Sequence, residues 1–270
     1  MDIQRTYPDG VTSWIDVEHP DLAVASEFYG GLFGWQFVEA GGGAYVIAQL
    51  DGHDVAGLAE GATGRWNTYV AFDDADGAAT RVTDEGGRIV MAPTAFGSAG
   101  RATFCEDAEG LAFRLWEARD RLGAQLTNAP GAWNFSDLLS AEPTAAATFY
   151  GAVFGWEISD LGLASMIRRP GYGDHLASTV DPGIHERQEA VAAPPGFADA
   201  IGWLATVGAD EQPGWHVTFT VGDRDDAAAS VERLGGAVLA TEDSEWTRTA
   251  LVRDPAGAVF TASQFAPPTG

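Results

Sequence analysis

The chain contains no lysine and a single cysteine, so its fifteen basic residues are all arginines, against 39 acidic residues. The formal net charge of −24 repels phosphate backbones and anionic membrane surfaces, which excludes nucleic acid and membranes as expected partners. The lone Cys105 rules out an internal disulfide and a thiolate metal cluster. Within ATFCED we expect it to be a small buried residue of a strand, because no base is visible beside it.

Long apolar runs are also missing. No segment approaches the roughly 18 uninterrupted apolar residues of a membrane-spanning helix. The stretch MDIQRTYPDG lacks the apolar core of a signal peptide, and we therefore expect a cytoplasmic chain. The length of 270 residues, 46% of them hydrophobic, suits one large or two ordinary domains, each with a proper core.

An internal repeat organises the chain. The octet FYGGLFGW at 28–35 returns as FYGAVFGW at 149–156. Two further pairs of segments repeat in the same order: WNTYVAFDDADGAA (66–79) with WHVTFTVGDRDDAA (215–228), and EDAEGLAF (106–113) with RDPAGAVF (253–260). These matches indicate a tandem duplication. The second copy also has an insertion within 171–205, rich in glycine, proline and alanine, which we expect to form a loop rather than a lid.

Each copy has the periodicity of a strand, a helix and three strands, followed by the same order again. SWIDVE (13–18) alternates as a strand, Asp21 can cap the next helix, and Gly34 can end it in the left-handed conformation. The second half of this copy predicts a strand, a helix and three strands at 66–72, 75–85, 88–91, 101–106 and 111–117. The duplication therefore predicts four βαβββ modules.

The order SWIDVE, FYGGLFGW, WNTYVAFDD and D-x-x-G-x-x-F-x-L-W resembles the vicinal oxygen chelate superfamily, which includes glyoxalase I, the bleomycin-resistance proteins and the extradiol dioxygenases. More narrowly, the chain is similar to its two-domain glyoxalase-like subfamily, often labelled hydroxylases. The resemblance implies an α+β fold of two tandem domains, whose four modules form cupped mixed sheets with the helices outside. We expect domains at 11–118 and 131–266, joined by a linker at 119–130. Adjacent and swapped pairing of the modules both stay open, as do a monomer with pseudo-dimeric domains and a homodimer.

Members of this superfamily hold a metal ion on His or Glu side chains of the first and last strands of their modules. The resemblance assigns these positions to Trp14, Asn67 and Arg114 in the first copy, and to Phe135, His216 and Thr261 in the second. His216 alone is an ordinary ligand for Fe, Ni or Zn, and Arg114 adds a positive charge where the ion would sit. We therefore expect no metal cofactor. Asp16, Glu18 and Asp137 lie on the same faces and keep an unorthodox site open.

Strand alternation places a set of aromatic and polar side chains on the concave sheet face of the first copy, namely Trp14, Asp16, Asn67, Tyr69, Arg114 and Trp116. Such a set can stack on a flat molecule and hydrogen-bond its edge. The alternative is that the aromatic rings merely fill the cup and that Arg114 neutralises Asp16. In the second copy, His216 and Asp137 are a candidate base and its orienting group, or His216 is simply hydrogen-bonded in a filled barrel.

The remaining histidines are weaker candidates. His19 and His53 sit where a solvated side chain is expected, and His175 and His185 lie in the insertion with a spacing that matches no known metal site. Three functions follow from these observations. The first, which we favour, is a metal-free binder of a small planar or aromatic molecule. The others are a metal-dependent enzyme of the lyase or dioxygenase type that uses His216, and a non-catalytic scaffold with filled cups.

Overall fold

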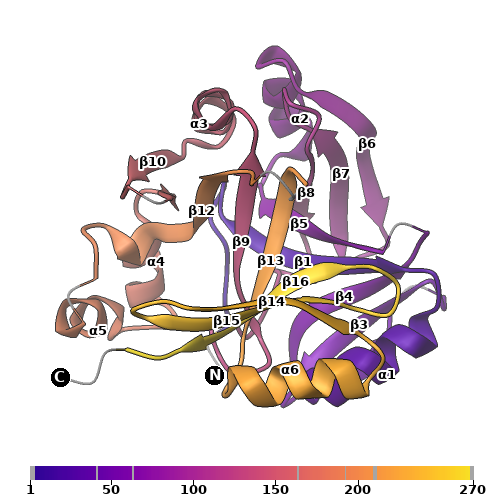
Figure 1. Ribbon diagram of the computed structural model, residues 1–270. Coiled ribbons are helices and arrows are strands. Elements are labelled where there is room, and N and C mark those ends of the chain that lie inside the picture. The colour runs from indigo at the N-terminus through magenta and orange to yellow at the C-terminus, as the bar shows by residue number, and fades with distance from the viewer. Residues whose placement is uncertain are drawn as a thin grey trace. The chain divides into compact units, whose positions relative to one another are not determined.

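The computed structural model describes residues 4–40, 42–62, 64–162, 164–191, 193–208 and 212–267 (Figure 1). The βαβββ order recurs four times along the chain. The first module comprises β1 (Thr12–His19), α1 (Leu22–Phe33), β2 (Gln36–Glu39), β3 (Tyr45–Leu50) and β4 (His53–Glu60). The second comprises β5 (Arg65–Ala71), α2 (Ala75–Asp84), β6 (Arg88–Phe96), β7 (Gly100–Glu106) and β8 (Ala112–Ala118).

The second copy repeats this order with one addition. The third module comprises β9 (Trp133–Ser140), α3 (Pro143–Phe154), β10 (Glu157–Asp160), β11 (Ser165–Arg168) and β12 (Ala200–Thr206). The fourth comprises β13 (Gly214–Thr220), α6 (Arg224–Arg233), β14 (Ala237–Asp243), β15 (Thr247–Arg253) and β16 (Val259–Phe265). The prediction of four βαβββ modules is confirmed. No helix in the described ranges is both long and apolar enough to cross a membrane.

The strands form two mixed eight-stranded sheets, one per copy. Their orders are β2-β3-β4-β1-β5-β8-β7-β6 and β10-β11-β12-β9-β13-β16-β15-β14. Within each module the first strand runs parallel to a strand that follows the helix, as β5 does beside β8, and the remaining ladders are antiparallel. This is the α+β architecture that the sequence predicts.

The repeated octet is a helix exit, as its glycines suggest. Asp21 caps α1 by accepting hydrogen bonds from the backbone N–H groups of Ala23 and Val24. Gly34 ends the helix with φ +75°, and Gly155 ends α3 with φ +69°. Glycine enters this left-handed region without a steric penalty, which allows the chain to turn directly into the next strand.

The expectation of a loop at 171–205 is wrong. Two short helices, α4 (Tyr172–Ser178) and α5 (Ile184–Ala190), and the 3-10 turn η1 (Phe197–Asp199) precede β12. Buried Tyr172, Leu176 and Ile184 attach this segment to its apolar surroundings. Composition alone misleads here, because a few apolar anchors suffice to order a segment that is otherwise rich in glycine, proline and alanine. Residue 192 lies outside the described residues.

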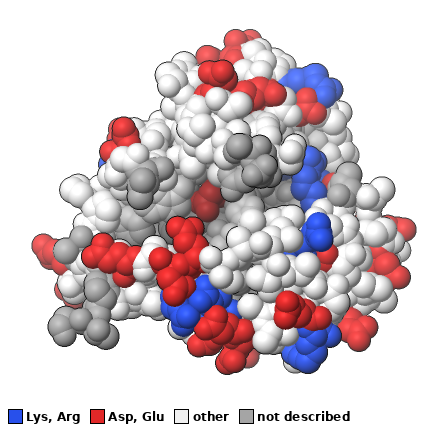
Figure 2. Space-filling view, viewed as in Figure 1, with Lys and Arg blue, Asp and Glu red and all other residues white. Residues whose placement is uncertain are grey.

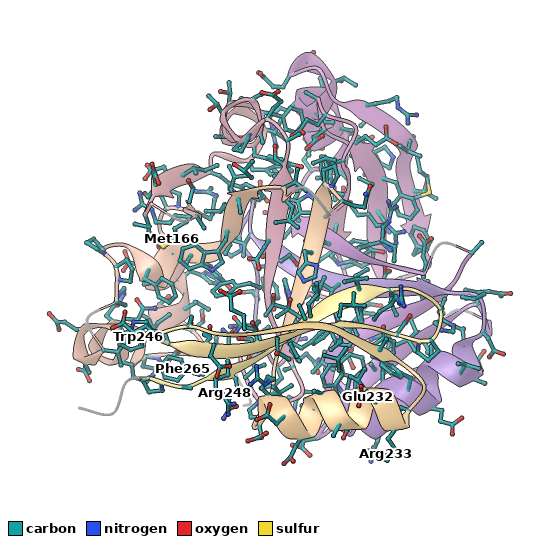
Figure 3. The ribbon with its side chains drawn as sticks, in the orientation of Figure 1. Met166, Glu232, Arg233, Trp246, Arg248 and Phe265 are labelled. Atoms are coloured by element: carbon teal, nitrogen blue, oxygen red, sulfur yellow. The ribbon has the colours of Figure 1, made fainter. Side chains whose placement is uncertain are left out.

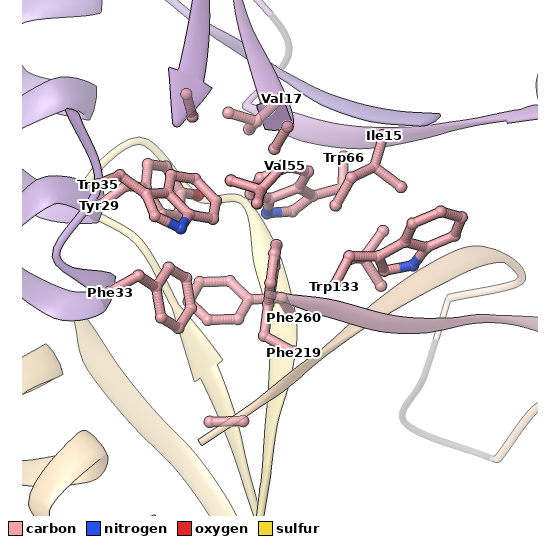
Figure 4. Packing of buried hydrophobic residues seen from close by; sticks show 14 of the residues in the cluster. Ile15, Val17, Tyr29, Phe33, Trp35, Val55, Trp66, Trp133, Phe219 and Phe260 are labelled. Carbon is pink, nitrogen blue, oxygen red and sulfur yellow. The ribbon is translucent and has the colours of Figure 1, made fainter. Parts of the chain in front are cut away.

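The chain packs as two compact units, and each draws on both copies. One comprises Met1–Ser13, Thr68–Gly123 and Ser136–Trp215, and the other Trp14–Asn67, Ala124–Phe135 and His216–Gly270. We call them unit 1 and unit 2. In unit 2, Phe33 and Trp35 of the first copy pack against Phe219 of the second, with ring centres 4.7 and 5.7 Å apart respectively (Figure 4). The predicted boundary at 119–130 remains a prediction.

Candidate functional site

In unit 1, strand register places an arginine between two aromatic residues. Arg114 on β8 is the direct neighbour of Tyr69 on β5 and of Phe104 on β7. The guanidinium carbon lies 4.0 Å from the Phe104 ring centre and 5.3 Å from the Tyr69 ring centre. Cations favour the faces of aromatic rings at such distances, especially where water is excluded. The cation of Arg114 is therefore held by its neighbours in the sheet.

Burial and hydrogen bonding fix the same side chain. Arg114 is only 7% exposed, and its Nη1 donates to the hydroxyl of Tyr69 over 2.7 Å. A guanidinium keeps its charge even when it is buried, because it is not deprotonated in proteins. Unit 1 therefore presents a permanent, aromatic-flanked positive charge in a chain whose net charge is −24.

Trp116 lies next to this group. Its ring meets Tyr69 edge to face at 6.3 Å, and its Nε1 donates to the backbone carbonyl of Arg121 over 2.8 Å. A glycine makes room for it, because a Cβ on Gly100 would lie 2.6 Å from the indole ring. We call Tyr69, Phe104, Arg114 and Trp116 the arginine cluster.

Unit 2 holds the rest of the residues predicted for the first copy. Asp16 is fully buried, and its Oδ1 accepts a hydrogen bond from Asn67 Nδ2 at 2.9 Å. Its Oδ2 accepts from the hydroxyl of Tyr45 at 3.2 Å, and Trp14 Nε1 donates to that hydroxyl over 2.9 Å. Trp14, Asp16, Tyr45 and Asn67 form what we call the aspartate cluster. Its carboxylate is satisfied from both sides, as buried polar groups usually are.

The candidate base and its orienting group have separate partners. His216 Nε2 lies 2.8 Å from Thr261 Oγ1 in unit 2, and Asp137 in unit 1 accepts a hydrogen bond from the backbone N–H of Trp203 at 3.0 Å. Cooperation between His216 and Asp137 therefore stays a prediction.

Two of the weaker candidates have definite environments. His19 is 2% exposed rather than solvated, so that expectation is wrong. Its Nδ1 accepts a hydrogen bond from the backbone N–H of Asp21 at 3.0 Å, which ties the end of β1 to the cap of α1. Cys105 is buried in β7 as expected, and burial raises the pKa of its thiol to about 12. It is therefore a packing residue rather than a nucleophile.

Both copies match one family of domains. The profile of a glyoxalase-like domain matches residues 122–263, and that of the glyoxalase/bleomycin resistance protein/dioxygenase superfamily matches residues 13–115. The chain belongs to this superfamily. Membership agrees with the repeated module and with the resemblance of the sequence motifs.

Two proteins with similar sequences align with nearly the whole chain. A putative glyoxylase, CFP32, of Mycobacterium tuberculosis (strain CDC 1551 / Oshkosh) is 33% identical, with 99% of both chains covered. The anthracycline biosynthesis protein DnrV of Streptomyces peucetius is 30% identical, over 96% of this chain and 94% of its own. Both relatives therefore align with both copies of this chain.

Solved structures of the superfamily share the fold at low sequence identity. A Mn(II)-bound glyoxalase from Novosphingobium aromaticivorans is 14% identical, with a TM-score of 0.64 over 95% of this chain and 82% of that one. A catechol 2,3-dioxygenase is 12% identical, with a TM-score of 0.59 over 97% of this chain and 90% of that one. These likenesses show the fold alone.

The residues at the assigned ligand positions of the first copy do not suit the superfamily's metal. Within the described ranges, no three His, Cys, Asp or Glu side chains come together in a way that suits an ion. At the positions assigned by resemblance, Asn67 and Arg114 both act as hydrogen-bond donors, to Asp16 and Tyr69 respectively. Divalent ions require several His or carboxylate ligands, and a guanidinium repels them. We therefore derive no chemistry from a metal.

Sequence reasoning missed Tyr45 and Phe104. Each stands on a strand whose face the alternation argument did not follow. A signal existed for Tyr45, because Gly57 interrupts the strand pattern of β4, and a glycine inside a strand often marks a close approach by another group. No comparable signal pointed to Phe104, whose role depends on its register against Arg114.

Proposed function

We propose that this protein binds a small planar or aromatic molecule with a negative or strongly polar edge, and that it does so without the metal of its superfamily. The observation that carries the proposal is the position of Arg114, buried to 7% exposure between Phe104 and Tyr69. A carboxylate or phenolate is the natural partner of such a cation, because charge-assisted hydrogen bonds to guanidinium are strong and directional.

The flat walls of the arginine cluster support a planar ligand. Trp116, Tyr69 and Phe104 offer ring faces and edges for stacking, and small-molecule sites are usually built from aromatic walls with few polar groups. The same arrangement argues against nucleic acid, because one cation does not offset a net charge of −24.

The names of two relatives favour one class of ligand. Those named for anthracycline biosynthesis are 30% identical to this chain along almost its full length. Anthracyclines have a fused planar ring system with phenol and quinone oxygens at its edge, which is the chemistry that the arginine cluster suits. We therefore place polycyclic aromatic acids first among the ligands to test.

Quenching of tryptophan fluorescence by anthraquinone-2-carboxylate tests the proposal. The wild type should bind saturably, and Arg114→Leu should bind at least about tenfold more weakly, since a hydrogen bond to a charged group contributes about 1.5–3 kcal/mol. Trp116→Ala should also weaken binding. Arg253→Leu, which removes an exposed arginine at the end of β15, is the matched control and should bind as the wild type does.

Equal binding by all these variants, or no binding by the wild type, would favour the alternative function, a non-catalytic scaffold in which the aromatic residues only fill the sheet face. Melting temperatures of each variant should be measured in parallel, so that unfolding is not mistaken for lost affinity.

A further inference from the structure

The aspartate cluster of unit 2 contains a polarised tyrosine. The Tyr45 hydroxyl donates to the buried Asp16 carboxylate at 3.2 Å and accepts from Trp14 Nε1 at 2.9 Å. A phenol that donates to a carboxylate becomes a better acceptor for another O–H group, because hydrogen bonds in a chain strengthen one another. Asn67 donates to the other oxygen of Asp16 and so fixes the orientation of the carboxylate.

The backbone is shaped around this tyrosine. A Cβ on Gly57 would overlap the Tyr45 hydroxyl oxygen, so only glycine leaves space for it. Gly57 is the direct strand neighbour of Asp16, so the phenol crosses β4 to reach the carboxylate. Replacing Gly57 by any other residue would displace the hydroxyl.

The second copy shows that the fold does not require this arrangement. Strand register makes Ser165 the counterpart of Tyr45, because Ile47 pairs with Gly57 and Ile167 with Gly202. The repeat makes Asp137 the counterpart of Asp16, and it accepts a backbone N–H instead of a phenol. The aspartate is therefore common to both copies, and the tyrosine is specific to the first.

We propose that Tyr45 is a proton-exchanging residue for a hydroxylated ligand, with Asp16 as the group that receives the proton. The ligand class is a phenol or an enol. The inference rests on the proposed function only in taking the ligand to be a small aromatic molecule. The residues that carry it all lie in unit 2.

The step needs no oxidant or metal. The O–H bond of the ligand breaks as its proton passes to the Tyr45 oxygen, while the proton of Tyr45 passes to Asp16 Oδ2. The ligand leaves the step as a phenolate or enolate, Tyr45 is again a neutral phenol, and Asp16 becomes a carboxylic acid. The negative charge has moved from the aspartate to the ligand. Trp14 keeps the tyrosine oxygen in place throughout.

The ionisation of a bound coloured phenol tests this step. The probe is 4-nitrophenol, whose phenolate absorbs visible light and whose neutral form does not, titrated with pH in the presence of excess full-length protein. The apparent pKa of the probe should fall on binding, with about a tenfold change in the ratio of its two forms. Tyr45→Phe and Asp16→Asn should bring the bound pKa back to that of the free probe.

Two control variants separate the step from general effects. Tyr172→Phe removes a buried phenol in unit 1 and should leave the shift of the probe intact. Trp246→Phe alters an exposed indole that stacks on Phe265 at 6.3 Å and should also leave it intact (Figure 3). Trp14→Phe should reduce the shift, because it removes the indole N–H that holds the tyrosine oxygen.

A bound probe with an unchanged pKa would contradict the inference, and so would a shift that survives in Tyr45→Phe or a wild type that does not bind the probe. The related acid 4-nitrobenzoate tests the proposed function separately, since it has a carboxylate and no phenol. Loss of 4-nitrobenzoate binding in Arg114→Leu tests the arginine cluster alone. The pKa shift of 4-nitrophenol tests the proton transfer and the binding of 4-nitrobenzoate tests the proposed function, so one proposal can fail while the other holds.

Discussion

The hydroxyl of Tyr29 donates a hydrogen bond to the carboxylate of Asp254, 225 residues away, over 2.9 Å. Tyr150 makes the same bond to Asp107 over 2.8 Å. Tyr29 and Tyr150 belong to the repeated octet, and the aspartates belong to the repeated turn after the third strand of a module. The octet of each copy is thus bound to the turn of the other copy. These hydrogen bonds join residues of both copies within one unit, as the hydrophobic core of each unit does.

We expect loss of either bond to lower the free energy of unfolding. Tyr29→Phe and Tyr150→Phe should each cost about 1–3 kcal/mol in urea titrations, because a buried carboxylate loses a donor. Tyr172→Phe is the matched control. It removes a buried phenol whose ring stacks on His175 and which has no carboxylate partner among the described residues, so it should cost less. Equal costs in all three variants would contradict the role of the aspartates.

The same tyrosines predict a loss of stability at high pH. Burial raises the pKa of Tyr29 and of Tyr150 well above the usual value of 10.0. A phenol with a raised pKa in the folded state stabilises it fully below the unfolded pKa, and this contribution is lost as pH rises through the folded value. Unfolding free energy should therefore fall above about pH 10. The fall should be shallower in the double variant Tyr29→Phe/Tyr150→Phe, and an unchanged slope would oppose this account.

Local signals in the sequence predict the elements but not their partners. Asp21 and Gly34 mark the start and end of a helix within one stretch of chain, so α1 can be predicted from its own residues. Local signals do not predict which modules pair, because the pairing depends on contacts between distant residues, such as that of Tyr29 with Asp254. The structure provides both kinds of pairing: adjacent modules share a sheet, and modules of different copies share a core.

The candidate site likewise has a part that the sequence predicts and a part that depends on contacts between strands. Strand alternation predicts that Tyr69, Arg114 and Trp116 share one face of their sheet, because side chains alternate with a period of two. In the structure Tyr69 contacts both Arg114 and Trp116. It does not predict that Phe104 flanks Arg114 or that Tyr45 reaches Asp16. The first contact depends on the register between β7 and β8, and the second on the room that Gly57 leaves beside Asp16. A single strand encodes neither.

Cutting the chain between its copies should not separate them. A protease site inserted between the exposed residues Arg119 and Asp120 would give two fragments. Each core combines residues from both fragments, as Phe33 with Phe219 and Phe113 with Tyr150 illustrate. The fragments should co-elute in size-exclusion chromatography and separate only in denaturant. Separation in native buffer would mean that each copy folds independently.

The thiol of Cys105 should be unreactive in the native protein. Burial leaves it 1% exposed and raises its pKa to about 12, so little thiolate is present at pH 8. Ellman's reagent should react with it slowly under native conditions and promptly in guanidinium chloride. Fast reaction in the native state, at a rate equal to that in denaturant, would show that this strand opens readily.

Metal titration tests the replacement of the superfamily's ligands. Calorimetry with Fe²⁺, Ni²⁺ or Zn²⁺ should show no stoichiometric tight binding, because Trp14, Asn67 and Arg114 do not supply the His or carboxylate ligands that these ions need. His216→Ala serves as the comparison, since His216 is the one ordinary ligand at an assigned position. One equivalent of metal that is lost in His216→Ala would favour the metal-dependent enzyme instead.

A calorimetric cycle tests the claim that Arg114 recognises the acidic edge of a planar ligand. Wild type and Arg114→Leu are each titrated with anthraquinone-2-carboxylate and with its uncharged amide. We expect the substitution to weaken binding of the acid by about tenfold or more and to change binding of the amide much less, since only the acid forms a charge-assisted pair. Equal losses for acid and amide would show that Arg114 only supports the packing of the sheet face, and would contradict the claim.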